Sequence, residues 1–354
     1  MWIRSRELLF KFYLCQTKPN TTYMFENYDF PGLFRTIAQK RVLIIGDVMI
    51  DTYLWGRVER VSPEAPVPIV SDIIEESRLG GAANVALNIK AMGAVPILCS
   101  VIGGDERGSL FLDLLEEQNL ADVGITVDDY RLTTRKTRVI AGFKHLLRFD
   151  EEMESGLSKR IQGVFTEMVL NLIQTGGIDV VIFQDYDKGV ITKSVIAEVS
   201  SLAGQMNIPV MADPKFKNFS DFRSITLFKP NLKEFLNGVQ AEASRTELEK
   251  IARAGMKFRK AQDIGHLVVT LSDNGMLVME DNNFQHIPAV KRQVTDVSGA
   301  GDTVISLLAL CYVAGMNSVQ SAAVANLAGG QVCERSGVVP VDRELLEKEC
   351  REML

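Results

Sequence analysis

The fold of this chain is decided by the stretch Val294-Thr-Asp-Val-Ser-Gly-Ala-Gly-Asp-Thr-Val-Ile305. At its centre is a glycine-rich turn, Gly299-Ala300-Gly301, and the run from Thr303 to Ala314 that follows is apolar enough for a buried helix. A glycine-rich turn that opens a helix directs several backbone N–H groups at one point, with the positive end of the helix dipole behind them. The stretch therefore predicts a site for an anion such as phosphate.

One carboxylate, Asp302, stands at the end of this turn. A second negative charge beside a bound phosphate is unfavourable unless it has a chemical task, such as accepting the proton of an attacking hydroxyl. This pattern suggests phosphoryl transfer to an alcohol, with Asp302 as the base. The alternative is an ordinary helix start, where the dipole favours an acid in the first turn. The stretch alone favours the alternative, so the rest of the chain must decide.

The composition indicates a globular α/β protein. The 354 residues are 46% hydrophobic and 24% charged, which suits one large domain or two small ones with a full core. The net charge is −6, and acidic and basic residues are intermixed, so the sequence shows no cluster of basic residues that would indicate nucleic-acid binding. Five scattered cysteines without a C-x-x-C pair, and three distant histidines, argue against zinc or a histidine-based triad. We expect reduced cysteines, a cytoplasmic location and no membrane span.

The first residues differ from the rest. Residues 1–15 carry early arginines and some apolar side chains, but Glu7 and Lys11 interrupt the apolar run and no cleavage site for a signal peptide follows. Met24 stands before a more ordinary start. We expect residues 1–23 to be a non-native or disordered extension, and residues 24–354 to form the working domain.

Polar side chains follow several of the predicted strands. From residue 41 onward, short apolar strands alternate with helices, which predicts a mostly parallel sheet with helices on both faces. The carboxyl ends of such strands share one edge, where ligands bind. The residues expected at that edge are Asp47 and Asp51 after the strand 41–45, Asp185 and Lys188 after 179–183, Asp213 and Lys215 after 209–212, and Asn231 and Glu234 after 225–228.

Two segments, about 52–78 and 131–150, are expected to form a small separate sheet. The first contains Pro63, Pro66 and Pro68, which exclude a helix and indicate edge strands with a turn. The second contains the densest cationic set in the chain, including Arg138 and Arg148. These could meet a substrate phosphate or could simply line a solvated strand face. Such a sheet would serve as a lid or a dimer surface.

A second glycine turn, Gly80-Gly81-Ala82-Ala83-Asn84, opens another helix and completes a set of motifs. This turn, the Asn231-x-x-Glu234 pair and Asp296-Val-Ser-Gly-Ala-Gly-Asp-Thr303 resemble, in that order, the signatures of the ribokinase-like (phosphofructokinase-B) sugar kinases. The resemblance covers the chain from about residue 36. It implies a three-layer α/β fold with a mostly parallel central sheet and a small β-sheet lid, ATP and Mg²⁺ as cofactors, and a homodimer paired through the lid.

The resemblance also implies roles for single residues. Asp302 would be the base, and the N–H groups of the turn would stabilise the transferring phosphoryl group. The residues that would bind the sugar phosphate are Asp47, Asp51, Gly80, Gly81, Asn84, Arg138, Arg148, Asp185, Lys188 and Lys215. Those that would bind the nucleotide are Asn231, Glu234, Thr270, Ser272, Gly275 and Asn326. Mg²⁺ would be bound through water by Asn231 and Glu234. For Asn326 an alternative interpretation is nearly as good, namely that it is simply a buried polar residue of a helix.

Within this family, several stretches resemble the kinases that act on D-glycero-β-D-manno-heptose 7-phosphate. They include residues 46–51, residues 60–68 and Asp185-Tyr-x-Lys-Gly189. The resemblance implies phosphorylation of the anomeric hydroxyl, in the route to ADP-heptose for lipopolysaccharide. Because the chain ends at Leu354, we expect a free-standing kinase without a nucleotidyltransferase half. Two alternatives stay open: a family member acting on another sugar or sugar phosphate, and a non-catalytic binding protein of the same fold.

Overall fold

The computed structural model describes residues 24–142 and 144–354, so the expected extension at residues 1–23 lies outside the described residues. The centre is a nine-stranded sheet with the order β13-β12-β11-β10-β9-β8-β1-β4-β5. All neighbours from β11 to β5 are parallel, whereas β12 is antiparallel to β11 and β13. This confirms the predicted mostly parallel sheet. Its strands are β1 (Arg41–Gly46), β4 (Val95–Gly103), β5 (Gly124–Asp128), β8 (Val180–Gln184), β9 (Val210–Asp213), β10 (Leu227–Phe228), β11 (His266–Thr270), β12 (Met276–Glu280) and β13 (Asn283–Ile287).

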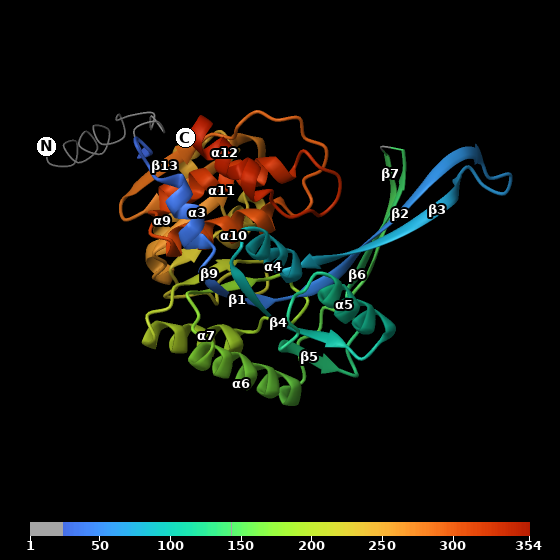
Figure 1. Cartoon of the computed structure of the whole chain (residues 1–354), viewed down its shortest axis with the longest axis horizontal. Coiled ribbons are helices and arrows are strands. Elements are labelled where there is room, and N and C mark those ends of the chain that lie inside the picture. Colours follow the sequence, from blue (N-terminus) through green and yellow to red (C-terminus); the bar gives the residue numbers. More distant parts are fainter. Residues whose placement is uncertain (1–23, 143) are drawn as a thin grey trace, which may run out of the picture.

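Helices cover both faces of this sheet, which gives three layers (Figure 1). One face packs on α3 (Phe30–Ile37), α4 (Ala82–Ala91), α5 (Glu106–Glu117), α10 (Ala300–Val313), α11 (Ser318–Val332) and α12 (Arg343–Met353). The other packs on α6 (Lys159–Thr175), α7 (Lys193–Gln205), α8 (Leu232–Gly238) and α9 (Leu248–Gln262). A short 3₁₀ turn, η1 (Ser272–Asn274), joins β11 to β12. Among the described residues, no helix has the length and apolar character needed to cross a bilayer.

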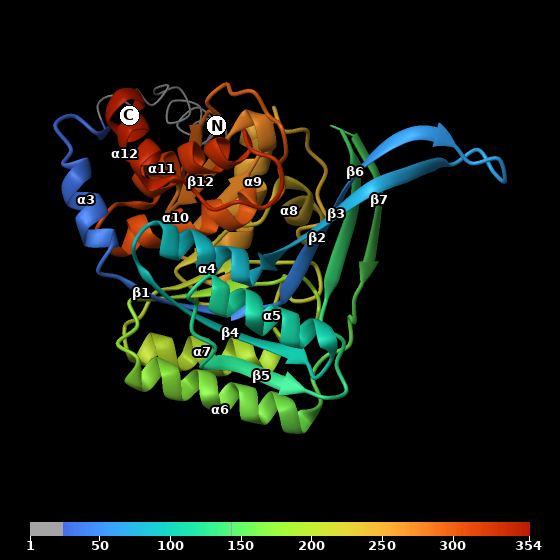
Figure 2. The same cartoon turned by 45° about the vertical axis from the view of Figure 1, so that its right-hand side comes forward.

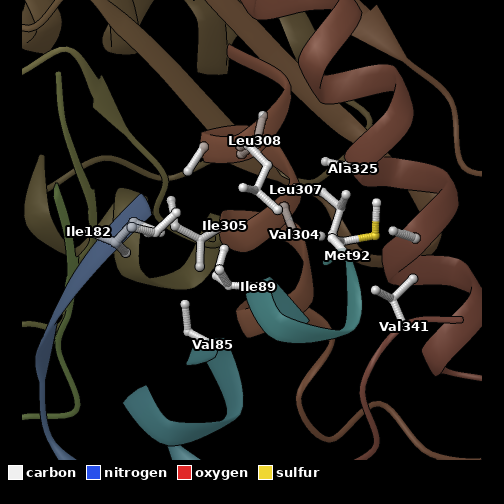
Figure 3. Packing of buried hydrophobic residues seen from close by; sticks show 14 of the residues in the cluster. Val85, Ile89, Met92, Ile182, Val304, Ile305, Leu307, Leu308, Ala325 and Val341 are labelled. Atoms are coloured by element: carbon white, nitrogen blue, oxygen red, sulfur yellow. The ribbon is translucent and has the colours of Figure 1, made fainter. Parts of the chain in front are cut away.

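The helix α10 is the buried centre of one of these layers. Its residues Val304 to Cys311 are all buried, so the helix is apolar around its whole circumference rather than along one stripe. Figure 3 shows Ile305 directed toward Ile182 of β8, with Val85 and Ile89 of α4 below it. Dense packing of this kind fixes the start of α10, and with it Asp302, relative to the sheet and to α4.

The four-stranded lid sheet projects from the body with the order β3-β2-β6-β7 (Figures 1 and 2). Its strands are β2 (Val48–Val61), β3 (Pro68–Gly81), β6 (Arg135–Ala141) and β7 (Lys144–Glu151). Two segments far apart in sequence thus form one sheet, as predicted. The strand β2 begins at Val48 rather than near Thr52, because pairing with β3 continues to Val48↔Gly81. Asp51, which follows the predicted strand 41–45, therefore lies within a second strand, β2.

Candidate functional site

The carboxylate of Asp302 lies at the centre of a buried hydrogen-bond network. Its Oδ2 accepts from Asn84 Nδ2 at 2.8 Å, and its Oδ1 accepts from Gln184 Nε2 at 3.1 Å and from the Tyr186 hydroxyl at 2.5 Å. Only 4% of Asp302 is exposed. These donors come from α4 and from the end of β8 with the loop that follows it, so two distant parts of the chain meet the start of α10 at this carboxylate.

Local backbone geometry places the two glycine turns face to face. Gly299 caps α10 with a φ of 80°, a left-handed conformation that disfavours side chains, and a Cβ there would lie 2.7 Å from Asn84 Nδ2. Gly81 caps α4 with a φ of 62°, and a Cβ there would lie 2.5 Å from the carbonyl oxygen of Asp47. Gly299 therefore permits a close approach of α4 and α10 at the site, and Gly81 permits a close approach of the start of α4 to the backbone of Asp47.

The start of α10 has the free amides expected of an anion site. In the described part of the chain, the N–H groups of Gly301 and Asp302 have no acceptor, as is usual in a first helical turn. The Ala300 N–H donates to Val297 through a long 3.3 Å bond. Beside this turn lies a buried ion pair, because a Cβ on Gly301 would sit 3.7 Å from Lys229 Nζ and 3.8 Å from Asp213 Oδ2. The arrangement offers donors and one cation to an anion.

Burial, together with the nearby Asp213 carboxylate, raises the pKa of Asp302 to about 6. Hydrogen bonds from Asn84 and Tyr186 oppose this shift, as does Lys229. A carboxyl group with a pKa of about 6 is ionised at neutral pH yet more basic than an ordinary aspartate. Those are the properties that a general base needs.

The ends of β8, β9 and β10 meet at one edge, as predicted. Gln184 pairs with Asp213 in the sheet register, and its Nε2 bridges the carboxylates of Asp213 and Asp302. Asp213 also forms an ion pair with Lys229 at 2.9 Å, and both residues are almost fully buried. Gln184 thus links the Asp213–Lys229 ion pair to the carboxylate of Asp302.

The carboxylate of Asp47 is buried and binds the backbone of the loop after β8. Its oxygens accept from the backbone N–H groups of Tyr186, Lys188 and Val190 at 2.9–3.0 Å. Burial nevertheless raises its pKa. Asp185, in this same loop, accepts from Asn218 Nδ2 at 2.9 Å, and burial together with the Asp47 charge raises its pKa to about 7. Of these two predicted edge residues, Asp47 fixes the loop and Asp185 remains a candidate for binding a sugar hydroxyl.

The base of the lid contributes Asp51 and Arg138, which form a buried ion pair at 2.5 Å. A Cβ on Gly80 would collide with the Asp51 carboxylate, which explains the glycine there. Arg148 lies directly opposite Arg138 in the strand register, so both cations share one face of the lid sheet. Arg148 is exposed and binds Asp150 through two hydrogen bonds. Lys188, in contrast, is buried and its Nζ lies 2.7 Å from Glu152.

Lys215 connects this cluster to the predicted nucleotide residues. It forms an ion pair with Glu234 and lies 5.4 Å from the centre of the Tyr186 ring. Burial would lower its pKa, but Asp213 and Glu234 raise it, so it stays charged. Glu234 and Asn231 form a capping box at the start of α8, and Asn231 bridges to Thr270 at the end of β11.

The remaining predicted nucleotide residues gather around the segment after β13. Asn326 donates from Nδ2 to the Pro288 carbonyl at 2.8 Å, and a Cβ on Gly275 would collide with Ile287. Ser272 is exposed in η1, three residues before Gly275. This group forms a second region, joined to the first by Thr270 and Asn231.

Sequence reasoning left several residues of the network without a role. These residues are Gln184, Tyr186, Asp213 and Lys229. All four stand at strand ends, within two residues of positions to which a role was assigned, so their position in the sequence was the signal that could have identified them. Asn88 offered no such signal: it lies inside α4, donates to the Asn84 carbonyl at 2.9 Å and accepts from the Thr303 hydroxyl at 3.0 Å. It links the two helices beneath the site.

Comparison with known proteins places this geometry in context. Residues 39–343 match the model of the pfkB family of carbohydrate kinases. Among curated proteins, the chain is 40% identical over 315 residues to the bifunctional protein HldE of Trichlorobacter lovleyi, and 39% identical over 319 residues to that of Geotalea uraniireducens. These matches cover 88% and 89% of this chain but 62% and 64% of the relatives. The chain thus spans less than two thirds of the length of these relatives.

Solved structures share the fold at much lower identity. A ribokinase from Arabidopsis thaliana, complexed with ribose and ATP, aligns with a TM-score of 0.67 and 18% identity, covering 88% of this chain and 99% of that one. The phosphofructokinase-2 from Escherichia coli in complex with substrates and products aligns with a TM-score of 0.70 and 18% identity, covering 87% and 97%. They confirm the ribokinase-like fold.

The contact between Gly299 and Asn84 can be tested by substitution. A Gly299→Ala variant is expected to lose stability through backbone strain of about 1–2 kcal/mol, and also to displace Asn84 from Asp302. Gly315→Ala is the matched control, because Gly315 follows the same helix with a φ of 101° and a Cβ there would meet nothing within 4 Å. Urea unfolding should show a larger loss for Gly299→Ala; equal losses would contradict the contact.

Proposed function

The chain belongs to the pfkB family of carbohydrate kinases, phosphotransferases with an alcohol group as acceptor, and we propose that it transfers the γ-phosphoryl group of ATP to the anomeric hydroxyl of D-glycero-β-D-manno-heptose 7-phosphate. The product would be the 1,7-bisphosphate, an intermediate on the way to ADP-heptose. The observation that carries the proposal is the buried Asp302 carboxylate beside the free amides of the turn. The similarity to HldE proteins supports the choice of substrate.

In this reaction Asp302 accepts the proton of the attacking hydroxyl. The amides at the start of α10 stabilise the negative charge on the transferring phosphoryl group, together with Lys229. Fixed donors in a site shielded from water stabilise such charge without reorganising, and loss of one typically raises the barrier by about 3–4 kcal/mol. The core packing around α10 supplies the rigidity that this requires.

The sugar phosphate would be held by the edge of the sheet and the lid. Asp185 and Asn84 contact sugar hydroxyls, while Asp47 positions the loop that carries Asp185. Arg138 is paired with Asp51, and Arg148 with Asp150. The two arginines lie directly opposite each other on one face of the lid sheet, and we propose that the phosphate of the substrate binds between them.

The nucleotide would lie along the region from Lys215 to Pro288. Asn231 and Glu234 present oxygen atoms, the ligand type that Mg²⁺ prefers. Their oxygens already serve the capping box and Lys215, which fits contact through the waters of a hydrated ion better than direct coordination. Mg²⁺ would neutralise charge on the nucleotide phosphates. Ser272, Gly275 and Asn326 would surround the adenosine.

The lid sheet carries exposed apolar side chains that suit a homodimer. Ile74, Leu147 and Ile73 are 68%, 58% and 54% exposed. These side chains lie on the two edge strands of the projecting sheet, β3 and β7, and we propose that a second copy of the lid pairs with this sheet and covers them. The dimer would also help the lid to exclude water from the cytoplasmic enzyme's site.

A Leu147→Glu variant is therefore expected to be monomeric, because it would bury an unpaired charge in the interface. Val123→Glu is the control: Val123 is 59% exposed and lies before β5, away from the lid. Sedimentation equilibrium would separate the two. A monomeric parent chain, or a dimer in both variants, would contradict pairing through the lid.

An Asp302→Asn variant is expected to lose phosphorylation by a factor of roughly 10²–10⁴, the usual contribution of a general base, while ATP binding by calorimetry is retained. In the unchanged enzyme, kcat/KM should fall as pH drops below about 6, because protonated Asp302 cannot accept a proton. Unchanged turnover in the variant would contradict the role as base. Intact ATP binding with no turnover of any sugar in the parent chain would favour a non-catalytic binding protein.

Substrate choice is tested by measuring ADP release with a panel of sugar phosphates and free sugars. Heptose 7-phosphate should be the best substrate, and Arg148→Gln should raise its KM while leaving the KM for ATP unchanged. Lys257→Gln, on an exposed turn of α9, is the control. Good turnover of another sugar with none of the heptose phosphate would establish the alternative, a family kinase of different specificity.

A further inference from the structure

The three donors to Asp302 are not equivalent. Asn84 and Gln184 are 0% and 1% exposed, and each is tied to a second partner, Asn88 and Asp213 respectively. The Tyr186 hydroxyl has Asp302 as its one hydrogen-bond partner among the described residues, and its side chain is partly exposed. Tyr186 is therefore the donor that can leave with the smallest loss of protein hydrogen bonds.

The carboxylate has little room for a further donor. Two carboxylate oxygens offer about four lone-pair positions in total. Oδ1 already accepts two hydrogen bonds and Oδ2 accepts one. An acceptor hydroxyl must donate to Asp302 before its proton can be transferred. The attacking hydroxyl therefore has to make a short O–H hydrogen bond to this carboxylate. The Tyr186 hydroxyl makes a hydrogen bond of the same type.

The loop around Tyr186 is built so that the side chain can move while the backbone stays. Asp47 binds the backbone amides of residues 186, 188 and 190, and the buried Arg131 guanidinium binds the Lys188 carbonyl. The ring itself is held by Lys215, which lies above it. Lys215 also pairs with Glu234, at the proposed nucleotide region, so a bound phosphate that attracts Lys215 would weaken its contact with the ring.

We propose that Tyr186 is a displaceable cover for the base: without sugar its hydroxyl occupies the position of the attacking hydroxyl and keeps water away from Asp302, and the sugar displaces it. This inference rests on the proposed kinase function. The reaction that the cover prevents is hydrolysis. In that reaction the oxygen of a water molecule forms a bond to the γ-phosphorus of ATP, the bond from that phosphorus to the bridging oxygen breaks, Asp302 takes the proton of the water, and ADP leaves.

The first test is ATP hydrolysis in the absence of sugar. Tyr186→Phe keeps the ring beneath Lys215 but leaves Asp302 Oδ1 with one donor in a buried site, and water is expected to take the vacant position. Hydrolysis without sugar should rise by roughly ten-fold, a modest part of what a general base supplies. The matched control is Tyr312→Phe, on the same helix as Asp302, where the ring packs against His266. It should hydrolyse ATP at the rate of the parent chain.

The second test separates displacement from a fixed structural role. The groups that face Asp302 are Asp213 and Lys229 from the sheet edge, Lys215, and Tyr186, whose hydrogen bond lowers the pKa of Asp302. Without that bond, the acidic limb of kcat/KM should move to higher pH, because kcat/KM reports the free enzyme. The acidic limb of kcat should stay in place, because it reports the complex, where Tyr186 has already left.

Three outcomes would overturn the inference. Hydrolysis at the parent rate in Tyr186→Phe means that Tyr186 does not shield the base. Equal shifts of both pH limbs mean that it stays on Asp302 when sugar is bound. A loss of melting temperature in Tyr186→Phe, with hydrolysis no higher than in the parent, means that it only holds the fold. A parent chain that phosphorylates no sugar would instead contradict the proposed function, so the two failures are distinguishable.

Discussion

The site depends on one constraint: the carboxylate of Asp302 is kept ionisable in a position from which water is almost excluded. Burial opposes its charge, and hydrogen bonds from Asn84, Gln184 and Tyr186 offset that cost. The donors come from α4 and from the end of β8 with the loop that follows it, so the carboxylate can be stabilised only when these two distant segments are both in place beside α10. The two glycine turns and the apolar packing of α10 serve this convergence.

Much of this was accessible from the sequence, because it depends on local pattern. The alternation of strands and helices predicts the parallel sheet, and parallel strands bring Gln184 and Asp213 to the same edge. The glycines and Asp302 mark the start of α10 within a few residues. What could not be predicted is how side chains share partners. Asp47 looked like a sugar ligand but binds three backbone amides, and Asn88 looked like an ordinary helix residue but joins two helices. Such choices depend on distances between segments that no local pattern contains.

The acids at the sheet edge illustrate how environment gives similar side chains different tasks. Asp213 is paired with Lys229 and Asp51 with Arg138, so their charges are compensated by cations, whereas Asp47 is held by backbone amides and burial raises its pKa. Asp185 and Asp302 have mainly neutral donors, and their pKa values rise to about 7 and about 6. Groups without a compensating cation are those left free to exchange protons or hydrogen bonds with a substrate. Cations thus distinguish Asp51 and Asp213 from the reactive acids, and three backbone amides give Asp47 its positioning role.

The central claim, that phosphoryl transfer takes place between Asp302 and the start of α10, is tested most directly by a crystal structure with sugar phosphate, ADP, Mg²⁺ and a fluoride mimic of the transferring phosphoryl group. The account predicts that the acceptor oxygen lies within hydrogen-bond distance of the Asp302 carboxylate, and that the mimic accepts from the free amides at the start of α10, those of Gly301 and Asp302. A mimic bound away from the α10 turn, or an acceptor oxygen out of reach of Asp302, would contradict it.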